Sequence, residues 1–324
     1  MSVFITGSMA YDRIMNFPGK FMDFILPDQI HNLNVSFFID RLDEKLGGNA
    51  GNISYSLNLL GEKGIVLASA GRDFDRYRAV MEERGLSLEG VRRIESELTA
   101  AAYIITDQAN NQITGFHAAA LTHPCLYKFP EMDAQRDLAI VCPSNPLDMN
   151  EHPLFYKEKG VRYIYDPAQQ LPILNPSDIL ERVGGAYLLV GNDYEIGLVM
   201  KLTGKSREEL VEMTRRGLVV TLGERGALVL EKGAGETAVP SAPVPDVADP
   251  TGAGDAFRAG LIKGLLLDRP LAECARLGAV CAAYCIEKHG TQEHGFTPED
   301  FAARYEAAFG GFWLREPLAT NISR

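Results

Sequence analysis

Short runs of Val, Ile and Leu alternate with helical segments along most of this chain, and this rhythm constrains the fold more than any other feature. Three such runs are residues 64–71, 138–142 and 186–191, and each precedes a stretch that we expect to be helical, such as 150–158 after the second run. Strands that are apolar along their whole length are buried on both faces, as in a parallel sheet covered by helices. We therefore predict an α/β fold with a mostly parallel central sheet and helices on both of its faces.

Two segments depart from this rhythm and predict a smaller, separate sheet. Residues 101–118 surround turn-forming residues and predict a β-hairpin, and residues 33–40 have the alternating apolar and polar side chains of a half-exposed strand. We expect a small β-lid formed by about 11–45 and 99–118. No linker or internal repeat divides the sequence, so the lid is predicted to be part of one domain over residues 1–324.

Composition narrows the kind of partner and the setting. The formal net charge of −11 disfavours a nucleic-acid partner, because phosphate backbones are bound by clustered Lys and Arg. The first residues lack the basic and apolar regions of a secretory signal, and no apolar run reaches the ~18 residues that span a bilayer. Five cysteines without a CxxC pair favour a reducing setting. We expect a cytoplasmic protein with no nucleic-acid or membrane partner.

The stretch DPTGAGDAFRAG at 249–260 places small residues and a carboxylate in front of an apolar helical run. The backbone N–H groups of Gly252, Ala253 and Gly254 can approach a ligand closely, and at a helix N-terminus they would form an anion site. Asp255 beside such a site is suited to act as a general base on an incoming hydroxyl. The alternative is an ordinary helix cap, and these residues alone leave both interpretations open.

This stretch resembles the C-terminal motif of the ribokinase-like (phosphofructokinase-B) sugar and nucleoside kinases, and GGNAGNISYSLNLLG at 47–61 resembles their N-terminal motif. The resemblance covers essentially the whole chain and implies an α/β sandwich with a β-lid that closes over the acceptor. It also implies that Asp255 deprotonates a primary hydroxyl. The N–H groups of residues 252–254 would then form the anion hole for the transferring γ-phosphoryl group.

Two further motifs resemble the parts of these kinases that bind ATP and its metal. NDYE resembles the family's N-x-x-E motif and implies that Asn192 binds near the nucleotide and that Glu195 acts on Mg²⁺, largely through water. TLGERG resembles the loop that contacts the nucleotide and implicates Thr221 and Gly223. Without the family, the first motif is a common helix start and the second an ordinary turn.

The family also uses a monovalent cation in many of its members. The resemblance implies that a K⁺ site, if this chain has one, lies near Asp249 and Thr251. Backbone carbonyls build most of such a site, and a sequence does not reveal them.

On the acceptor side, four residues occupy positions that hold sugar hydroxyls in the family. Ser8 and Asp12 follow the first predicted strand, where ligands of parallel sheets usually bind, and Gly48 and Asn52 belong to the GGNAGN turn. An aspartate in such a loop is otherwise a cap or turn residue. The resemblance implies that Asp12 accepts hydrogen bonds from two vicinal ribose hydroxyls.

Several segments, among them TGSMAYDRIMNFPGKF, DPAQQL and GTQE, are most similar to adenosine kinases of the actinobacterial type. This narrower resemblance implies that Ser36 and Phe116 hold the nucleoside, and an aromatic ring is suited to stack on a purine. Phe116 could instead be an ordinary core residue of the hairpin. The chain departs from the pattern at Ala102, where a second aromatic residue is expected.

These observations predict an ATP- and Mg²⁺-dependent kinase that phosphorylates the 5′-hydroxyl of a ribonucleoside, with adenosine as the preferred acceptor. A sugar kinase or a broad-specificity nucleoside kinase is the alternative within the family. A nucleoside-binding regulator without catalysis is the alternative outside enzymes. The apolar Phe37 and Phe38 on the predicted lid suggest a homodimer formed through the lid.

Overall fold

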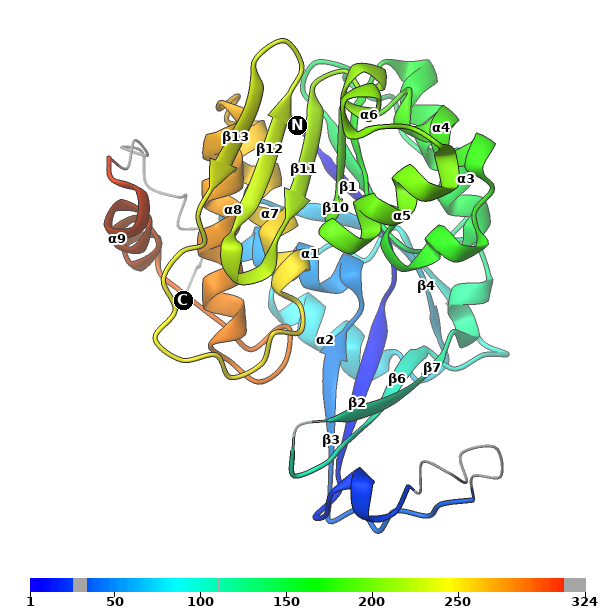
Figure 1. Cartoon of the computed structure of the whole chain (residues 1–324). Helices are drawn as coiled ribbons and strands as arrows, with labels where there is room; N and C mark the ends of the chain where they lie inside the picture. Colours follow the sequence, from blue (N-terminus) through cyan, green and yellow to red (C-terminus); the bar gives the residue numbers. More distant parts are fainter. Residues whose placement is uncertain (26–33, 110, 312–324) are drawn as a thin grey trace.

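The computed structural model describes residues 1–25, 34–109 and 111–311 (Figure 1). Its large sheet consists of β1 Val3–Thr6, β4 Gly64–Gly71, β5 Val91–Ile94, β8 Leu138–Val141, β9 Arg162–Tyr165, β10 Leu188–Asn192, β11 Gly217–Thr221, β12 Ala227–Glu231 and β13 Gly235–Val239. The strand order among these described residues is β13-β12-β11-β10-β9-β8-β1-β4-β5. Every neighbouring pair from β11 to β5 is parallel, and β12 and β13 add an antiparallel hairpin at one edge.

Helices cover both faces of this sheet. On one face lie α1 Asn49–Leu59, α2 Asp75–Glu83, α7 Ala253–Leu266, α8 Leu271–Ile286 and α9 Pro298–Phe309, and on the other lie α3 Pro146–Lys159, α4 Pro176–Val183, α5 Asp193–Thr203 and α6 Arg207–Met213. Short 3-10 helices span Phe21–Asp23, Ala119–Thr122, Ala168–Ile173 and Gly223–Arg225. Within the described residues, no helix combines the length and apolar character needed to cross a bilayer.

Because helices cover both faces of the sheet, its central strands are apolar along their whole length. Ile5 of β1 is buried in the core that contains α1, α7 and α8, whereas its neighbour Phe4 is buried in the core that contains α3 to α6. All four residues of β1 and of β8 are buried. Successive side chains of a strand point to opposite faces, so a strand with two cores needs apolar residues at every position. The predicted α/β class is therefore confirmed.

A second sheet stands apart from the large one and lies below it in Figure 1. Its strands are β2 Ala10–Asn16, β3 Arg41–Gly47, β6 Ala100–Thr106 and β7 Gln112–His117, in the order β3-β2-β6-β7. These strands fall largely in the two ranges predicted for the small sheet. Register places Asp12 of β2 opposite Ala102 of β6, and Ala102 opposite Phe116 of β7, so these three residues form one row across the sheet.

The strand predicted at 33–40 is wrong in the described part, because residues 34–40 belong to no strand. Their burial does alternate as expected, but β2 already pairs with residues 41–47 on that side. The aromatic ring of Phe37 packs on Phe17 and Phe21, with ring centroids 4.8 and 5.1 Å apart. Phe38 is 81% exposed. The dimer expected through this surface stays a prediction.

Local capping explains a helix start that the sequence prediction placed too late. The sequence predicts a helix over 150–158, whereas α3 begins at Pro146. The side chain of Asn145 accepts a hydrogen bond from the N–H of Leu147, and proline is favoured in the first helical turn because it has no N–H to satisfy. The Asn-Pro pair was therefore the better signal for this start.

The contact between α7 and α8 depends on glycine. A Cβ on Gly260 of α7 would lie 2.5 Å from the carbonyl oxygen of Leu277, and one on Gly278 of α8 would lie 2.7 Å from the carbonyl oxygen of Phe257. The two backbones are thus too close for any other residue at these positions. Because α7 begins at the DPTGAGD stretch, this packing also fixes where that helix N-terminus lies.

We expect Gly260→Ala to lower the free energy of unfolding by about 1–3 kcal/mol, because the added methyl overpacks this contact. Gly197→Ala in α5 is the matched control, since the described residues leave open space around a Cβ there. That control should gain up to about 1 kcal/mol from helix propensity. Urea unfolding measures both changes, and equal stability of the two variants would contradict the expectation.

Candidate active site

A cavity of about 1250 Å³ opens at the carboxyl ends of the parallel strands and is lined by residues of both sheets. Ligands of open α/β sheets bind at this edge, because the loops and helix N-termini converge there. Of the residues predicted from the sequence, it is lined by Ser8, Asp12, Gly48, Asn52, Phe116, Asn192, Glu195, Thr221, Gly223, Thr251, Gly252, Ala253, Gly254 and Asp255. Residues predicted from motifs up to about 240 positions apart therefore meet at one site.

The alternative role of Asp255 as a helix cap does not hold. Helix α7 starts at Ala253 after Gly252, whose φ of +79° is the left-handed conformation that favours glycine, and no side chain caps this start. Asp255 instead accepts a hydrogen bond of 2.8 Å at its Oδ2 atom from Nδ2 of Asn52. Its carboxylate therefore lies beside Asn52 of α1 in the cavity wall, close to the N–H groups of its own helix start. Of these groups, the N–H of Ala253 donates to the carbonyl oxygen of Pro250 at 3.3 Å.

Burial, above all, raises the pKa of Asp255 from its ordinary value to about 6, and the charges of Asp166 and Glu195 act in the same direction. The charge of Arg258 and the hydrogen bond from Asn52 oppose this rise. A carboxylate with a pKa near 6 is more basic than an exposed one and is still largely ionised at neutral pH. Such a group is suited to accept a proton from a hydroxyl.

A chain of buried side chains holds Asn52. The Oδ1 atom of Asn52 accepts hydrogen bonds from the hydroxyl of Thr291 at 2.8 Å and from Nε2 of Gln292 at 3.1 Å. Nε2 of Gln292 also bonds to the hydroxyl of Tyr77 at 2.6 Å, and that hydroxyl donates to the carbonyl oxygen of Gly47 at 2.9 Å. With its oxygen so occupied, the Asn52 amide is fixed with its N–H toward the carboxylate it serves.

This network reaches from α7 to the end of β3 in the small sheet. Sequence analysis assigned Asn52 to a sugar hydroxyl and did not identify the roles of Thr291, Gln292 and Tyr77. The GTQE stretch that contains the first two carried a signal only through its resemblance to a kinase family. Their contact with Asn52 spans about 240 positions and is created by the fold alone.

Sequence reasoning also missed a buried ion pair at the same helix start. Nε of Arg258 pairs with Oδ2 of Asp166, and both side chains are buried and line the cavity. A Cβ on Gly254 would lie 2.6 Å from an Nη atom of the same arginine, so the guanidinium lies directly over the backbone of the predicted anion hole. Burial by itself lowers the pKa of Arg258, but the charge and hydrogen bond of Asp166 raise it, so the group stays a cation.

Glu195 and Asn192 cap a helix and also line the cavity. Their side chains and backbones form a complete capping box at the start of α5, with hydrogen bonds of 2.7 and 2.8 Å. Both side chains also line the cavity. Burial and the nearby Asp166 raise the pKa of Glu195. The common helix start and the predicted metal position are thus both compatible with this geometry.

These acidic groups fit a magnesium ion. Within the described residues, the buried Oδ1 atom of Asp166 has no hydrogen-bond partner, and it lies in the same cavity wall as Glu195. Mg²⁺ keeps several waters and binds through one or two carboxylates together with substrate phosphates. Asp166 and Glu195 could supply those carboxylates.

On the small sheet, Asp12 and Phe116 both line the cavity and are separated by the small side chain of Ala102. Burial, followed by the charges of Asp255 and Asp249, raises the pKa of Asp12 to about 6. Phe116 is 56% exposed, so it is not the hairpin core residue that was the alternative interpretation. Its ring is available to a ligand.

The remaining acceptor-side residues are held by the backbone of the GGNAGN turn. Gly48 has a φ of +85°, and a Cβ there would lie 2.6 Å from the carbonyl oxygen of Ser8. The hydroxyl of Ser8 accepts a hydrogen bond of 3.1 Å from the N–H of Asn49. That hydroxyl keeps its proton for donation to a ligand.

Two predicted residues do not line the cavity. Ser36 is exposed on the segment that follows the undescribed residues 26–33, away from the cavity wall. Asp249 stabilises a turn, because its two carboxylate oxygens accept hydrogen bonds from the N–H groups of Thr251 at 2.9 Å and Gly290 at 3.1 Å. The monovalent cation site at this turn stays a prediction.

The model of the pfkB family of carbohydrate kinases matches residues 9–298. This chain belongs to that family. It is accordingly a phosphotransferase that acts on a hydroxyl group, and the alternative of a regulator without catalysis is set aside. The ribokinase-like fold predicted from the two glycine motifs is confirmed as well.

Nucleoside kinases are prominent among similar proteins. The structure of a nucleoside kinase from Burkholderia thailandensis in complex with inosine is 36% identical, with a TM-score of 0.85 over 95% of this chain and 98% of that one. The nucleoside kinase of Methanothermobacter thermautotrophicus is 28% identical over 314 residues, which are 94% of this chain and 95% of that protein. The structure of the Methanocaldococcus jannaschii nucleoside kinase has a TM-score of 0.82 at 26% identity, over 95% and 99% of the two chains. The narrower resemblance to actinobacterial adenosine kinases stays a prediction.

We expect Gln292→Leu to lower kcat about 10-fold with little change in the KM for ATP, because Asn52 would no longer be held in the orientation that serves Asp255. A weaker hydrogen bond to the carboxylate also raises its pKa. The acidic limb of the pH–rate profile should therefore move to higher pH.

The matched control is Gln135→Leu, an exposed glutamine in the turn before β8. It should leave kcat and the pH profile unchanged. Steady-state kinetics over a pH series checks both variants. A Gln292→Leu enzyme whose kcat falls without any shift of the acidic limb would assign that residue a purely structural role.

Proposed function

We propose that this protein transfers the γ-phosphoryl group of ATP to the 5′-hydroxyl of a purine ribonucleoside, with adenosine and inosine as the acceptors to be compared first. The observation that carries the proposal is that Asp255 and Asp12 line the same cavity. The first lies at a helix N-terminus suited to phosphate, and the second lies on the small sheet beside an exposed aromatic ring. A ribonucleoside presents a primary hydroxyl, a vicinal diol and a flat base, which match these three features.

In this mechanism the carboxylate of Asp255 accepts the proton of the 5′-hydroxyl as the hydroxyl oxygen bonds to the γ-phosphorus. The bond between that phosphorus and the bridging oxygen of ATP breaks in the same step, and ADP leaves with the electron pair. The N–H groups of Gly252 and Gly254 donate hydrogen bonds to the oxygens of the transferring group, where negative charge develops. The N–H of Ala253 donates to the carbonyl oxygen of Pro250 and joins them only if that bond opens. Arg258, held over Gly254 by its ion pair with Asp166, adds a buried positive charge at the same place. These groups are fixed before substrate binds, so little reorganisation accompanies the reaction.

ATP and Mg²⁺ are the proposed donor and metal. Thr221 and Gly223 lie at the end of β11, where they contact the nucleotide in this proposal. The apolar wall beside them suits an adenine ring and consists of Ala242, Val244, Val247, Ala279, Ala282, Ala283 and Ile286. Asp166 and Glu195 would hold Mg²⁺ through water, and the bound ion would neutralise phosphate charge.

The acceptor base is proposed to be recognised loosely. Ala102 lies between Asp12 and Phe116 in the row across the small sheet, so no bulky side chain fills that space. The base would therefore be held by stacking on one ring rather than clamped between two, and stacking discriminates weakly among purines. The complex of the Burkholderia thailandensis enzyme with inosine supports acceptance of bases other than adenine.

Substrate specificity is tested with adenosine, inosine, guanosine, cytidine, ribose and fructose 6-phosphate, each with ATP and Mg²⁺. We expect kcat/KM for the purine ribonucleosides to exceed that for either sugar by at least about 100-fold. The sugars have no base that could stack on Phe116 and be buried in the cavity. 2′-Deoxyadenosine should be about 10–100-fold poorer than adenosine, since a hydrogen bond to a charged group is lost. Asp12→Ala should remove that difference. Equal efficiency on a sugar and on nucleosides would overturn the proposed acceptor.

We expect Asp255→Asn to lower kcat by a factor of about 10²–10⁴ while ADP binding is retained, as for loss of a general base. In the wild type, kcat/KM should fall as the pH drops through about 6, because Asp255 must be deprotonated to act and its pKa is raised to about 6. Asp12, with a pKa also near 6, contributes to the same limb.

The matched control is Asp268→Asn, an exposed aspartate in a surface turn, which should keep normal kcat. Initial rates at saturating Mg²⁺ and calorimetric titration with ADP provide the measurements. A kcat of Asp255→Asn within threefold of the wild type would exclude the general-base mechanism.

A further inference from the structure

Away from the cavity, three buried side chains bring potential metal ligands together. They are Cys125, on the segment that leads to β8, and Asp148 and His152, one turn apart on α3. Each offers one donor atom, and these atoms all lie within 4.8 Å of one another. None of the three belongs to the motifs from which the kinase was identified.

The spacing of the donor atoms is close to that around a tetrahedral ion. Nε2 of His152 is 3.8 Å from Sγ of Cys125 and 3.8 Å from Oδ1 of Asp148. Zn²⁺ bonds of about 2.0–2.3 Å at tetrahedral angles would separate such donors by roughly 3.3–3.6 Å. The carboxylate and the imidazole are also too far apart for a direct hydrogen bond, which would require about 3 Å. A small inward movement of the side chains would complete the geometry.

Hydrogen bonds to the other atoms of His152 and Asp148 orient these donor atoms. Nδ1 of His152 forms a hydrogen bond of 2.8 Å with the hydroxyl of Thr6, at the end of β1. Oδ2 of Asp148 accepts a hydrogen bond of 2.9 Å from the backbone N–H of Cys125. These contacts leave Nε2, Oδ1 and Sγ directed at one another. Outer hydrogen bonds of this kind fix the ring and the carboxylate in protein metal sites.

The charge of the cluster calls for a cation. Asp148 is buried, and in the described part of the chain no Lys or Arg lies within ion-pair distance of it. Buried carboxylates are otherwise paired with a cation or bound to a metal. One divalent ion would balance the carboxylate together with a Cys125 thiolate, which leaves no net charge in the core.

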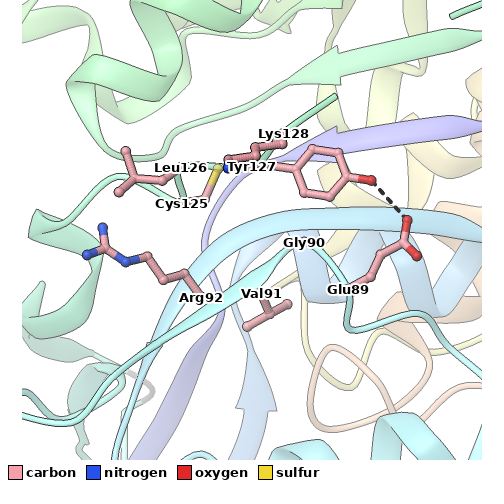
Figure 2. Close-up of a pocket in the computed structure, with 8 residues that line it drawn as sticks. All are labelled: Glu89, Gly90, Val91, Arg92, Cys125, Leu126, Tyr127 and Lys128. Carbon is pink, nitrogen blue, oxygen red and sulfur yellow. Dashed lines mark hydrogen bonds between the residues drawn. The ribbon is translucent and has the colours of Figure 1, made fainter. Parts of the chain in front are cut away.

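Of the three residues, Cys125 lines a separate cavity of about 300 Å³, whose wall also includes Arg92. Figure 2 shows the Cys125 sulfur at this wall, beside Leu126. Leu126 has a φ of +53°, a left-handed conformation that is strained for a branched side chain. Backbone strain of this kind concentrates at functional sites, and here it adjoins the residue that presents the thiol.

We propose that Cys125, Asp148 and His152 bind one Zn²⁺ ion, with a water molecule from the adjacent cavity as the fourth ligand. A thiolate and an imidazole select zinc over magnesium and calcium, which prefer oxygen donors. Binding replaces the thiol proton, which passes to solvent, with a Zn–S bond. The ion would tie the segment before β8 to the N-terminal half of α3 and so act on stability, since the catalytic residues lie elsewhere.

The experiment uses the full-length protein, freed of any affinity tag and of metal by chelation, and titrated with Zn²⁺ and separately with Co²⁺. We expect one Zn²⁺ per chain by elemental analysis, with a thermal unfolding midpoint that rises on zinc addition. Co²⁺ should produce an intense near-ultraviolet charge-transfer band from the thiolate, together with visible bands of tetrahedral cobalt.

Cys125→Ser and His152→Gln should each weaken Zn²⁺ binding at least tenfold and abolish the zinc-dependent shift. Cys281→Ser, which removes a buried thiol from α8, is the matched control and should bind zinc as the wild type does. Circular dichroism establishes that the variants are folded. If a variant does not fold, the wild-type cobalt spectrum decides: a thiolate band supports the site. The absence of that band, or zinc bound equally by Cys281→Ser and the two ligand variants, overturns the proposal.

Discussion

The start of helix α7 is the structural constraint on which the rest of the site depends. Its first turn places backbone N–H groups beside the carboxylate of Asp255, which lies within that same turn. A buried negative charge beside an anion site is costly unless other groups share it. Asn52 donates a hydrogen bond to the carboxylate, and Arg258 lies over the adjacent backbone. In the proposed mechanism, these contacts organise the cavity to bind a phosphate and to accept a proton before the substrate binds.

The same helix start is positioned by close packing elsewhere. Gly260 and Gly278 allow α7 and α8 to approach until their backbones touch, and α8 contributes part of the apolar wall next to the nucleotide loop. A second link runs through Asn52, Gln292 and Tyr77 to the end of β3. Hydrogen bonds thus connect the small sheet to the carboxylate of Asp255, and both line the same cavity. A movement of that sheet would therefore shift the groups that position this carboxylate.

Much of the fold and of the site could be predicted from the sequence. Apolar runs with helices between them indicated the parallel sheet, because burial on both faces requires apolar residues at every position. The two glycine motifs predicted residues that line one cavity, and the roles of these residues as anion site and general base stay predictions. The strand expected at 33–40 was wrong because alternation reports half-burial and not pairing, and β2 had a better partner in 41–47. Likewise, the start of α3 was set by the cap of Asn145, which periodicity does not register.

The local chemistry of this chain follows from its sequence: small residues before a carboxylate, an N-x-x-E helix start, and strands apolar enough to be covered on both faces. Which of these groups come into contact depends on the tertiary fold. Whether Asp255 caps its helix or faces a ligand depends on Asn52, about 200 positions away, and the Arg258–Asp166 pair joins two separate motifs. Contacts of this kind are set by how helices and strands pack. No local pattern encodes them, because the energy of a buried charge depends on the partners that the fold brings to it.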